Sequence, residues 1–238
     1  MTTATGLLVP KVRTTVVPIL GAAEPFPVRR VYCVGRNYLE HIREMKEGDE
    51  RNPPFFFQKP TDSVVTDGIV PYPTHTSDFQ YEVELVVAIG VPAQAVAVSQ
   101  AHNVVFGYAV GLDMTRRDRQ REAAKKGVAW EIGKSFDFSA PCGPIHPVSR
   151  VGHVVAGPIE LHVGSEVHQN SQLEKMIWNV PEIISHLSHQ YRLMPGDLIF
   201  TGTPAGVGPV VPGDTLMATI GGLSPLTVRI TESASHPC

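Results

Sequence analysis

The chain has few cysteines, and their spacing excludes two common ways of holding a fold together. Its 238 residues include three cysteines, Cys33, Cys142 and Cys238, and no CxxC pair. An odd number of scattered cysteines provides neither a disulfide framework nor a zinc-binding knuckle. We therefore expect a protein of a reducing compartment, and the cytoplasm is the simplest location.

Long apolar runs and a large net charge are also missing. The N-terminus has no basic region followed by a continuous apolar run, and nowhere does a run of about 18 uncharged apolar residues occur. The formal net charge is only −3, whereas a protein dedicated to polyanions is normally strongly basic. We expect neither a membrane nor a nucleic acid as a partner. The Gly-rich stretch TGTPAGVG lacks the Lys-Ser/Thr pair of a phosphate-binding loop, so it does not indicate a nucleotide site.

Short runs rich in Val, Ile, Thr and Phe make up most of the chain, among them VYCVG, ELVVAIG, VVFGYAVGLD, DLIFTGT and LTVRI. Such runs favour β-strands. The tripeptide PGD, which twice precedes a strand-like run, is typical of turns. We therefore predict an α+β fold that is predominantly β, with a few short helices. No low-complexity linker marks a domain boundary, and one large domain is the default for this length.

Three segments carry helix patterns. In residues 114–127, Thr115 and Asp118 have the spacing of a capping box, and Gly127 supplies a stop. In residues 180–191, Pro181 suits the first helical position and apolar residues recur at helical spacing. A third, shorter helix is expected within residues 37–48.

The strand-like stretch QYEVELVVAIG contains two acidic residues, Glu82 and Glu84. Residues i and i+2 of a strand project to the same side, so both carboxylates should point into one place. Burying like charges without a partner is costly, so something positive should lie between them. Asp113 ends the next strand-like run and completes a cluster of three if the two strands pair. Three carboxylates leave about half of an octahedral shell for water and substrate, which favours Mg²⁺ or Mn²⁺.

Two further pairs of residues have helical spacing. His41 and Glu44 in LEHIREM are three residues apart, so on a helix the carboxylate can orient and polarise the imidazole. Arg117 and Gln120 have the same spacing and can both face a site.

Six motifs occur in the order and at about the spacing found in the fumarylacetoacetate hydrolase superfamily. They are CVGRNYLEHIREM, QKP, YEVELVVAIG, GYAVGLDMTRRDRQ, GKSFDFSAPCGPI and DLIFTGTPAGVGPVVPGD. The series resembles the small acylpyruvase branch of that superfamily, most closely the enzymes that hydrolyse fumarylpyruvate in aromatic-acid degradation. The resemblance implies a mixed β-roll, commonly a homodimer, with an N-terminal extension over residues 1–28 and a catalytic domain over residues 29–238.

The resemblance also implies roles for single residues. The family binds Mg²⁺ through three acidic positions, which here are Glu82, Glu84 and Asp113. His41 and Glu44 match a water-activating dyad on a mobile lid, and Lys134 matches a cation beside the oxo acid end of the substrate. Residues that match substrate contacts of the family are Arg117, Gln120, Thr203 and Lys59, the last of these near the lid.

The implied activity is Mg²⁺-dependent hydrolysis of the bond between carbons 3 and 4 of a 2,4-dioxo acid. Fumarylpyruvate is the favoured substrate, in gentisate-type degradation, and maleylpyruvate or another acylpyruvate is an alternative. A second hypothesis is decarboxylation of oxaloacetate at the same metal site, and a third is a keto-acid or metal-binding module without catalysis. A distal carboxylate on the substrate would need a cation, for which Arg36 and Arg43 are available. The stretch PPFFF either lines the lid or forms a core strand.

Overall fold

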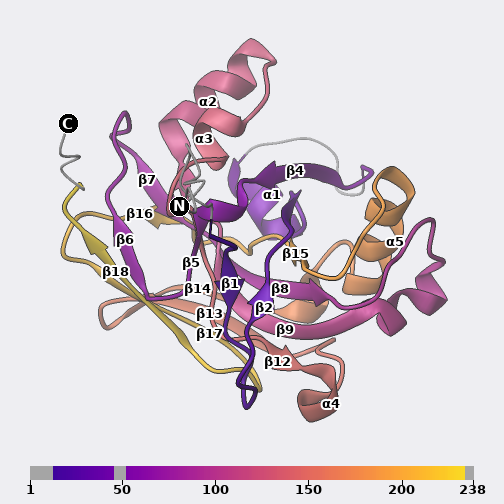
Figure 1. The fold of residues 1–238 in the computed structure, drawn as a ribbon. Coiled ribbons are helices and arrows are strands. Elements are labelled where there is room, and N and C mark those ends of the chain that lie inside the picture. Colours follow the sequence, from indigo (N-terminus) through magenta and orange to yellow (C-terminus); the bar gives the residue numbers. More distant parts are fainter. Residues whose placement is uncertain (1–12, 46–51, 234–238) are drawn as a thin grey trace, which may run out of the picture.

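The computed structural model describes residues 13–45 and 52–233. Cys238, residues 1–12 of the expected N-terminal extension and the end of the helix expected over residues 37–48 lie outside the described residues. The described part has an α+β fold that is predominantly β, with mixed sheets and a few short helices (Figure 1). This is the fold class that the sequence predicts.

The largest sheet has six strands in the order β12-β9-β8-β15-β3-β4. Its neighbouring strands are antiparallel except β15 and β3, which are parallel. The strands are β3 (Arg30–Gly35), β4 (Phe55–Lys59), β8 (Val83–Ile89), β9 (Val105–Leu112), β12 (His146–Pro147) and β15 (Asp197–Phe200). The pairing of β8 with β9 is the one on which a cluster of three carboxylates depends.

A second sheet has five strands in the order β14-β13-β17-β18-β6, antiparallel except for β18 and β6. The strands are β6 (Ile69–Pro71), β13 (Pro158–Val163), β14 (Glu166–Gln172), β17 (Thr215–Ile220) and β18 (Leu226–Thr231). Three smaller sheets contain β10 (Thr115–Arg116), β7 (Phe79–Tyr81) and β16 (Gly208–Pro209); β1 (Val16–Val17) and β2 (Phe26–Pro27); and β11 (Ala140–Pro141) and β5 (Val64–Val65).

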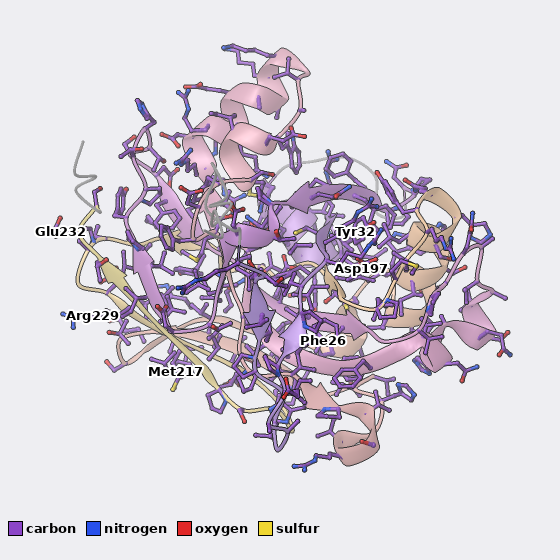
Figure 2. All side chains as sticks on the ribbon, viewed as in Figure 1. Phe26, Tyr32, Asp197, Met217, Arg229 and Glu232 are labelled. Carbon is purple, nitrogen blue, oxygen red and sulfur yellow. The ribbon has the colours of Figure 1, made fainter. Side chains whose placement is uncertain are left out.

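The six-stranded sheet is buried on both faces, because alternate residues of its central strands belong to two cores. Leu85 and Val87 of β8 pack in the main core, which they share with the five-stranded sheet. Val86 packs in the second core, together with Phe26 from the expected N-terminal extension (Figure 2). The five-stranded sheet instead alternates buried and exposed positions, as at Met217 of β17. Burial on both faces explains why the apolar run of β8 is continuous.

Five α-helices and three 3₁₀ turns connect the strands of the described part. They are α1 (Leu39–Met45), α2 (Arg117–Lys126), α3 (Glu131–Lys134), α4 (Val148–Val151), α5 (Val180–Gln190), η1 (Thr61–Ser63), η2 (Val98–Val104) and η3 (Leu173–Lys175). The predicted helix α5 is confirmed, with Pro181 in its first turn and a capping box between Asn179 and Glu182. In Figure 1, α2 and α3 stand together at one end of the sheets, away from α5. Within residues 13–45 and 52–233, no helix combines the length and the apolar character that a membrane span needs.

The capping box predicted for helix α2 is wrong. Thr115 lies in β10, where its hydroxyl donates to the carbonyl of Asp113 and accepts from Lys134. The carboxylate of Asp118 accepts hydrogen bonds from the hydroxyl of Thr76 and the N–H of Ser77, in the turn between β6 and β7. Tertiary contacts therefore take the side chains that local spacing assigns to the cap. Gly127 ends the helix at φ 64°, as predicted.

Candidate active site

Three carboxylates meet where the chain passes from one sheet to another. Glu82 separates β7, in the three-stranded sheet, from β8, in the six-stranded sheet. Glu84 lies in β8, and Asp113 follows β9, with its N–H donating to the carbonyl of Glu82 (2.9 Å). All three side chains are buried, and they offer ligand oxygens within 4.8 Å of one another. The strand break at Glu82 and the pairing of β8 with β9 thus bring the three acids together.

Three buried cations contact two members of this acidic cluster. Lys134 of α3 places Nζ 2.8 Å from an oxygen of Glu82 and 2.8 Å from an oxygen of Asp113. Arg117 of α2 places Nη2 2.5 Å from Glu82. Lys59 of β4 places Nζ 2.8 Å from the other oxygen of Asp113. Glu82 and Asp113 are therefore neutralised from within the protein.

Glu84 is the carboxylate that these cations do not pair with. It accepts a hydrogen bond from Gly202 N (2.7 Å) and forms no ion pair with any described residue. Burial, together with the charges of Asp113 and Glu82, raises the pKa of Glu84 well above its usual range. Burial is the largest single influence on Glu82 and acts to raise its pKa, but the charges of Lys134 and Arg117, with smaller contributions from His41 and the Lys134 hydrogen bond, together lower that pKa. A divalent cation would give Glu84 the positively charged partner that it lacks among the described residues, and carboxylate oxygens suit a hard cation. The residues present fit such an ion.

Helix α1 places a histidine at the pocket that the three carboxylates line. His41 lines the pocket, and its Nδ1 lies 3.1 Å from Oε2 of Glu44. Glu44 also accepts the N–H of Gly206, 3.2 Å from Oε1. The hydrogen bond from His41, with a smaller contribution from Gly206, lowers the pKa of Glu44. When Nδ1 donates to Glu44, Nε2 is the ring nitrogen that remains for a ligand in the pocket.

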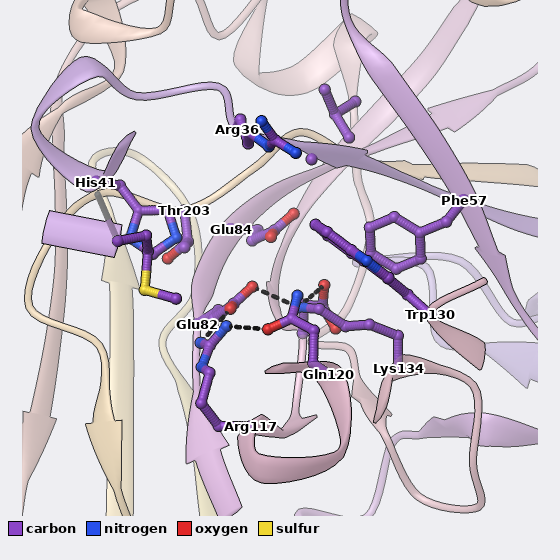
Figure 3. A pocket seen from close by; sticks show the side chains of 14 residues that line it. Arg36, His41, Phe57, Glu82, Glu84, Arg117, Gln120, Trp130, Lys134 and Thr203 are labelled. Carbon is purple, nitrogen blue, oxygen red and sulfur yellow. Dashed lines mark hydrogen bonds and ion pairs between the residues drawn. The ribbon is translucent and has the colours of Figure 1, made fainter. Parts of the chain in front are cut away.

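Helix α2 and the loop after β15 supply polar groups to the pocket wall. Arg117 donates from Nη1 to Oε1 of Gln120 (2.6 Å), so the amide nitrogen of Gln120 remains as a donor. Thr203 is 3% exposed and lies beside His41 (Figure 3). The structure therefore brings the predicted residues Arg117, Gln120, Thr203, His41 and Lys134 to one pocket.

Lys59 is the predicted substrate contact that the structure places elsewhere. Its Nζ donates to the carbonyls of Met114 (3.2 Å) and Lys134 and pairs with Asp113, and it does not line the described pocket. Lys59 is the last residue of β4, an edge strand of the six-stranded sheet, and its side chain is buried. Lys59 therefore contributes positive charge to the acidic cluster without lining the pocket.

Aromatic side chains form the wall opposite Thr203 (Figure 3). Phe57 and Trp130 have ring centroids 6.3 Å apart. Residues 55–57 of the stretch PPFFF belong to strand β4, and Phe57 also lines the pocket. Sequence reasoning missed Trp130, because a single tryptophan outside a periodic segment gives no spacing signal. Arg36 lines the pocket, whereas Arg43 is not among its described lining residues.

Comparisons with known proteins give close relatives over most of the chain. A fumarylpyruvate hydrolase of Ralstonia sp is 46% identical over 177 residues, which cover 74% of this chain and 92% of that protein. The human mitochondrial oxaloacetate tautomerase FAHD1 is 38% identical over 205 residues, covering 86% of this chain and 92% of that protein. The crystal structure of a fumarylpyruvate hydrolase from Pseudomonas aeruginosa, in complex with Mn²⁺ and pyruvate, has a TM-score of 0.93 and 47% identity. It covers 96% of this chain and all of that one.

These likenesses and the pocket define a class, the metal-dependent hydrolases built on a mixed β-roll. Residues 30–231 match the model of the protein family described as fumarylacetoacetate (FAA) hydrolase C-terminal. The chain belongs to the fumarylacetoacetate hydrolase family.

Proposed function

We propose that this chain is a metal-dependent acylpyruvate hydrolase that converts fumarylpyruvate and water to fumarate and pyruvate. One observation carries the proposal: three buried carboxylates and His41 line the same pocket, so a metal-bound oxo acid and a base can face each other. The identities of 46% and 47% with fumarylpyruvate hydrolases support this choice of substrate.

The oxo acid end of the substrate is assigned to the acidic cluster. Glu82, Glu84 and Asp113 are the ligands for Mg²⁺ or Mn²⁺, the second of which is bound in the Pseudomonas aeruginosa structure. A divalent ion held there would chelate a 2-oxo carboxylate and stabilise the negative charge that develops on its keto oxygen. Lys134, which touches both Glu82 and Asp113, adds positive charge on the same side.

His41 is the proposed general base. Glu44 holds Nδ1, so Nε2 can take a proton from a water molecule as the water oxygen bonds to carbon 4 of the substrate. The bond between carbons 3 and 4 then breaks, and its electron pair leaves with the pyruvate half as an enolate. Protonation of carbon 3 completes the addition of one water.

The two ends of the substrate meet different polar groups. Gln120 and Thr203 are proposed donors to the oxo acid end, because both line the pocket beside the acidic cluster. Arg36 lines the rim on the side opposite Arg117 (Figure 3). It adopts φ 61°, a left-handed conformation that is uncommon for a residue with a side chain. We assign the distal carboxylate of the fumaryl group to Arg36.

A second candidate function is a reaction of oxaloacetate at the same site. The 38% identity with an oxaloacetate tautomerase favours it, and enol formation or decarboxylation of a 2-oxo acid draws on the same stabilisation of an enolate. Decarboxylation needs no attacking water, so the pair of His41 and Glu44 is better explained by hydrolysis than by decarboxylation. Enol formation would use the same pair as the base that removes a proton from carbon 3.

Further proposals concern the setting of the enzyme. We infer a homodimer from the family, a cytoplasmic location from the cysteine content, and a place in gentisate-type degradation. The division into an extension over residues 1–28 and a catalytic domain over residues 29–238 also stays a proposal.

A substrate panel tests the function. Protein is treated with a chelator, and fumarylpyruvate, maleylpyruvate, acetylpyruvate and oxaloacetate are each assayed before and after addition of Mg²⁺ or Mn²⁺. We expect no turnover without metal, and the highest kcat/KM for fumarylpyruvate, with fumarate and pyruvate formed in equal amounts. Full activity after chelation would overturn the assignment of the metal site. A preference for oxaloacetate would replace hydrolysis by the second candidate function.

A further inference from the structure

Gln169 is a fully buried polar residue in a strand whose neighbouring positions are exposed. It lies in β14, an edge strand of the five-stranded sheet, and its exposure is 0%, whereas His168 and Asn170 are exposed. Its side chain leaves this sheet and reaches two places at the active site.

One end of the Gln169 amide holds the backbone between two acidic residues of the site. Oε1 accepts the N–H of Val83 (3.0 Å), which stands between Glu82 and Glu84. Val83 is the first residue of β8, directly after the break between β7 and β8. The hydrogen bond therefore supports the point where the chain turns both carboxylates toward the pocket.

The other end of the amide holds the loop after β15. Nε2 donates to the hydroxyl oxygen of Thr203 (2.9 Å) and to the carbonyl of Pro204 (2.8 Å). The orientation of the amide is not ambiguous, because a backbone N–H can only donate and a backbone carbonyl can only accept. Nε2 must therefore face Thr203, and the Thr203 oxygen must act as an acceptor toward Gln169.

This arrangement fixes what Thr203 can offer to a ligand. A threonine hydroxyl has one hydrogen, and its oxygen is already engaged by Gln169 as an acceptor. No acceptor for that hydrogen lies among residues 13–45 and 52–233, and Thr203 lines the pocket. The hydrogen is left for a group inside the pocket, and an anionic oxygen is the acceptor that gains most from it.

We propose that Gln169 is a positioning residue that makes Thr203 a hydrogen-bond donor to the carboxylate of the bound oxo acid. This inference rests on the proposed function, which supplies the oxo acid. Gln169 does not touch the substrate; it acts through the direction of the Thr203 hydroxyl. Its removal should weaken binding of the oxo acid more than binding of the metal.

The test measures Mn²⁺ affinity and then pyruvate affinity of the Mn²⁺-loaded protein by calorimetry. Gln169→Met keeps the length of the side chain and removes both polar ends. We expect pyruvate to bind on the order of 10- to 100-fold more weakly, the worth of a hydrogen bond to a charged group, and Mn²⁺ affinity to change by less than about 3-fold. Gln172→Met makes the same chemical change at an exposed position of the same strand and should leave both affinities unchanged.

A double-mutant cycle separates positioning from a general structural effect. Thr203→Val removes the hydroxyl, so adding Gln169→Met to it should weaken pyruvate binding little further. If Gln169→Met does not fold, Gln169→Glu is measured with and without Thr203→Val. Its carboxylate can still accept from Val83 but turns the Thr203 hydroxyl toward itself. Pyruvate binding should therefore fall when Thr203 is present, and much less when Thr203→Val has already removed the hydroxyl.

Three results would overturn the inference. The first is that the fold losses of pyruvate affinity in Gln169→Met and Thr203→Val multiply in the double variant. The second is that Gln169→Met loses Mn²⁺ affinity as much as pyruvate affinity. The third is that Gln169→Met binds pyruvate normally although Thr203→Val binds it more weakly. Failure of the proposed function looks different, because then the unaltered Mn²⁺-loaded protein does not bind pyruvate, and the inference falls with it.

Discussion

At the scale of single residues, the buried acidic cluster has an uneven distribution of partners. Glu82 and Asp113 have Lys134, Arg117 and Lys59 as partners. Glu84 has a backbone N–H instead, and its pKa is raised by burial and by the neighbouring carboxylates. A purely structural network of ion pairs would gain nothing from burying a third acid without a cation. This imbalance is a physical reason to place a metal ion there.

The pair of His41 and Glu44 separates hydrolysis from decarboxylation of oxaloacetate. If His41 deprotonates the attacking water, His41→Ala or Glu44→Gln should lower kcat for fumarylpyruvate on the order of 10²- to 10⁴-fold, the usual worth of a positioned general base. Decarboxylation of oxaloacetate should fall much less, because it needs no attacking water. Both rates are measured for each variant at saturating Mg²⁺.

Helix α1 offers a matched control for that experiment. Glu40 is an exposed acid of the same helix, and it pairs with Lys175 at the surface (3.0 Å). Glu40→Gln should leave both activities unchanged. Equal losses of the two activities in the His41 variant would mean that α1 only closes the site, and unchanged hydrolysis would exclude His41 as the base.

Local spacing predicts only part of this site. The same-side projection of Glu82 and Glu84 and the shared helix face of His41 and Glu44 depend on the chain within four residues, and the structure has both. Asp113 needed the assumption that two strands pair. Gln169 lies 86 residues from Val83 and reaches it across two sheets, so no local pattern indicates it.

At the scale of elements, the short helix α3 depends on one glycine. An added Cβ at Gly133 would lie 2.7 Å from N and 2.8 Å from Cα of Gln120, which are backbone atoms of α2. The two helices therefore approach closely only because position 133 has no side chain. This contact sets the positions of Lys134 on one helix and of Gln120 on the other.

Gly133→Ala should consequently damage the active site. The methyl group must push α3 away from α2, and overpacking of this kind costs about 1 to 3 kcal/mol of stability. Circular dichroism should show a folded protein, and kcat/KM for fumarylpyruvate should be lowered at least about 10-fold. The reason is that displacing catalytic groups by even about 1 Å lowers the reaction rate strongly.

Gly127 provides the comparison for that variant. It has φ 64° at the end of α2, and an added Cβ would meet nothing within 4 Å, so Gly127→Ala costs about 1 kcal/mol of backbone strain without moving α3. Its unfolding temperature should fall while kcat/KM stays close to that of the unaltered protein. Full activity in Gly133→Ala would show that the close approach of the two helices does not position the site.

The same scale shows where element prediction succeeds and where it fails. Helix α5 spans Val180–Gln190, against residues 180–191 predicted, and Pro181 lies in its first turn as predicted; its capping box, which is also local, is not among the predicted features. Thr115 has the right spacing to cap α2, but Lys134 and the carbonyl of Asp113 take its hydroxyl. Local caps are therefore reliable for α5, which packs through one apolar face, and unreliable for α2, whose first residues belong to the active site.

At the scale of the whole molecule, the two large sheets are tied together by a buried histidine. His146 of β12, in the six-stranded sheet, accepts the N–H of Ser224 at Nε2 (3.0 Å). Ser224 lies in the turn between β17 and β18 of the five-stranded sheet. Nε2 can accept this hydrogen bond only when it carries no proton, and burial lowers the pKa of His146.

This histidine should make the stability of the molecule depend on pH. Because the folded state binds a proton at His146 less readily than the unfolded state, stability is present above the unfolded pKa of about 6.5 and is lost as pH falls below it. Each tenfold difference in proton affinity between the two states corresponds to about 1.4 kcal/mol, or roughly 3 to 6 °C in the unfolding temperature of a chain of this size. Thermal unfolding followed from about pH 7.5 to about pH 5.5, on either side of that pKa, should show a falling Tm.

His146→Gln keeps an acceptor for Ser224 but cannot titrate, so its Tm should fall less over the same range. His75→Gln replaces an exposed histidine and should leave the slope unchanged. If His146→Gln has the same slope as the unaltered protein, the contact between the sheets does not depend on the protonation of His146.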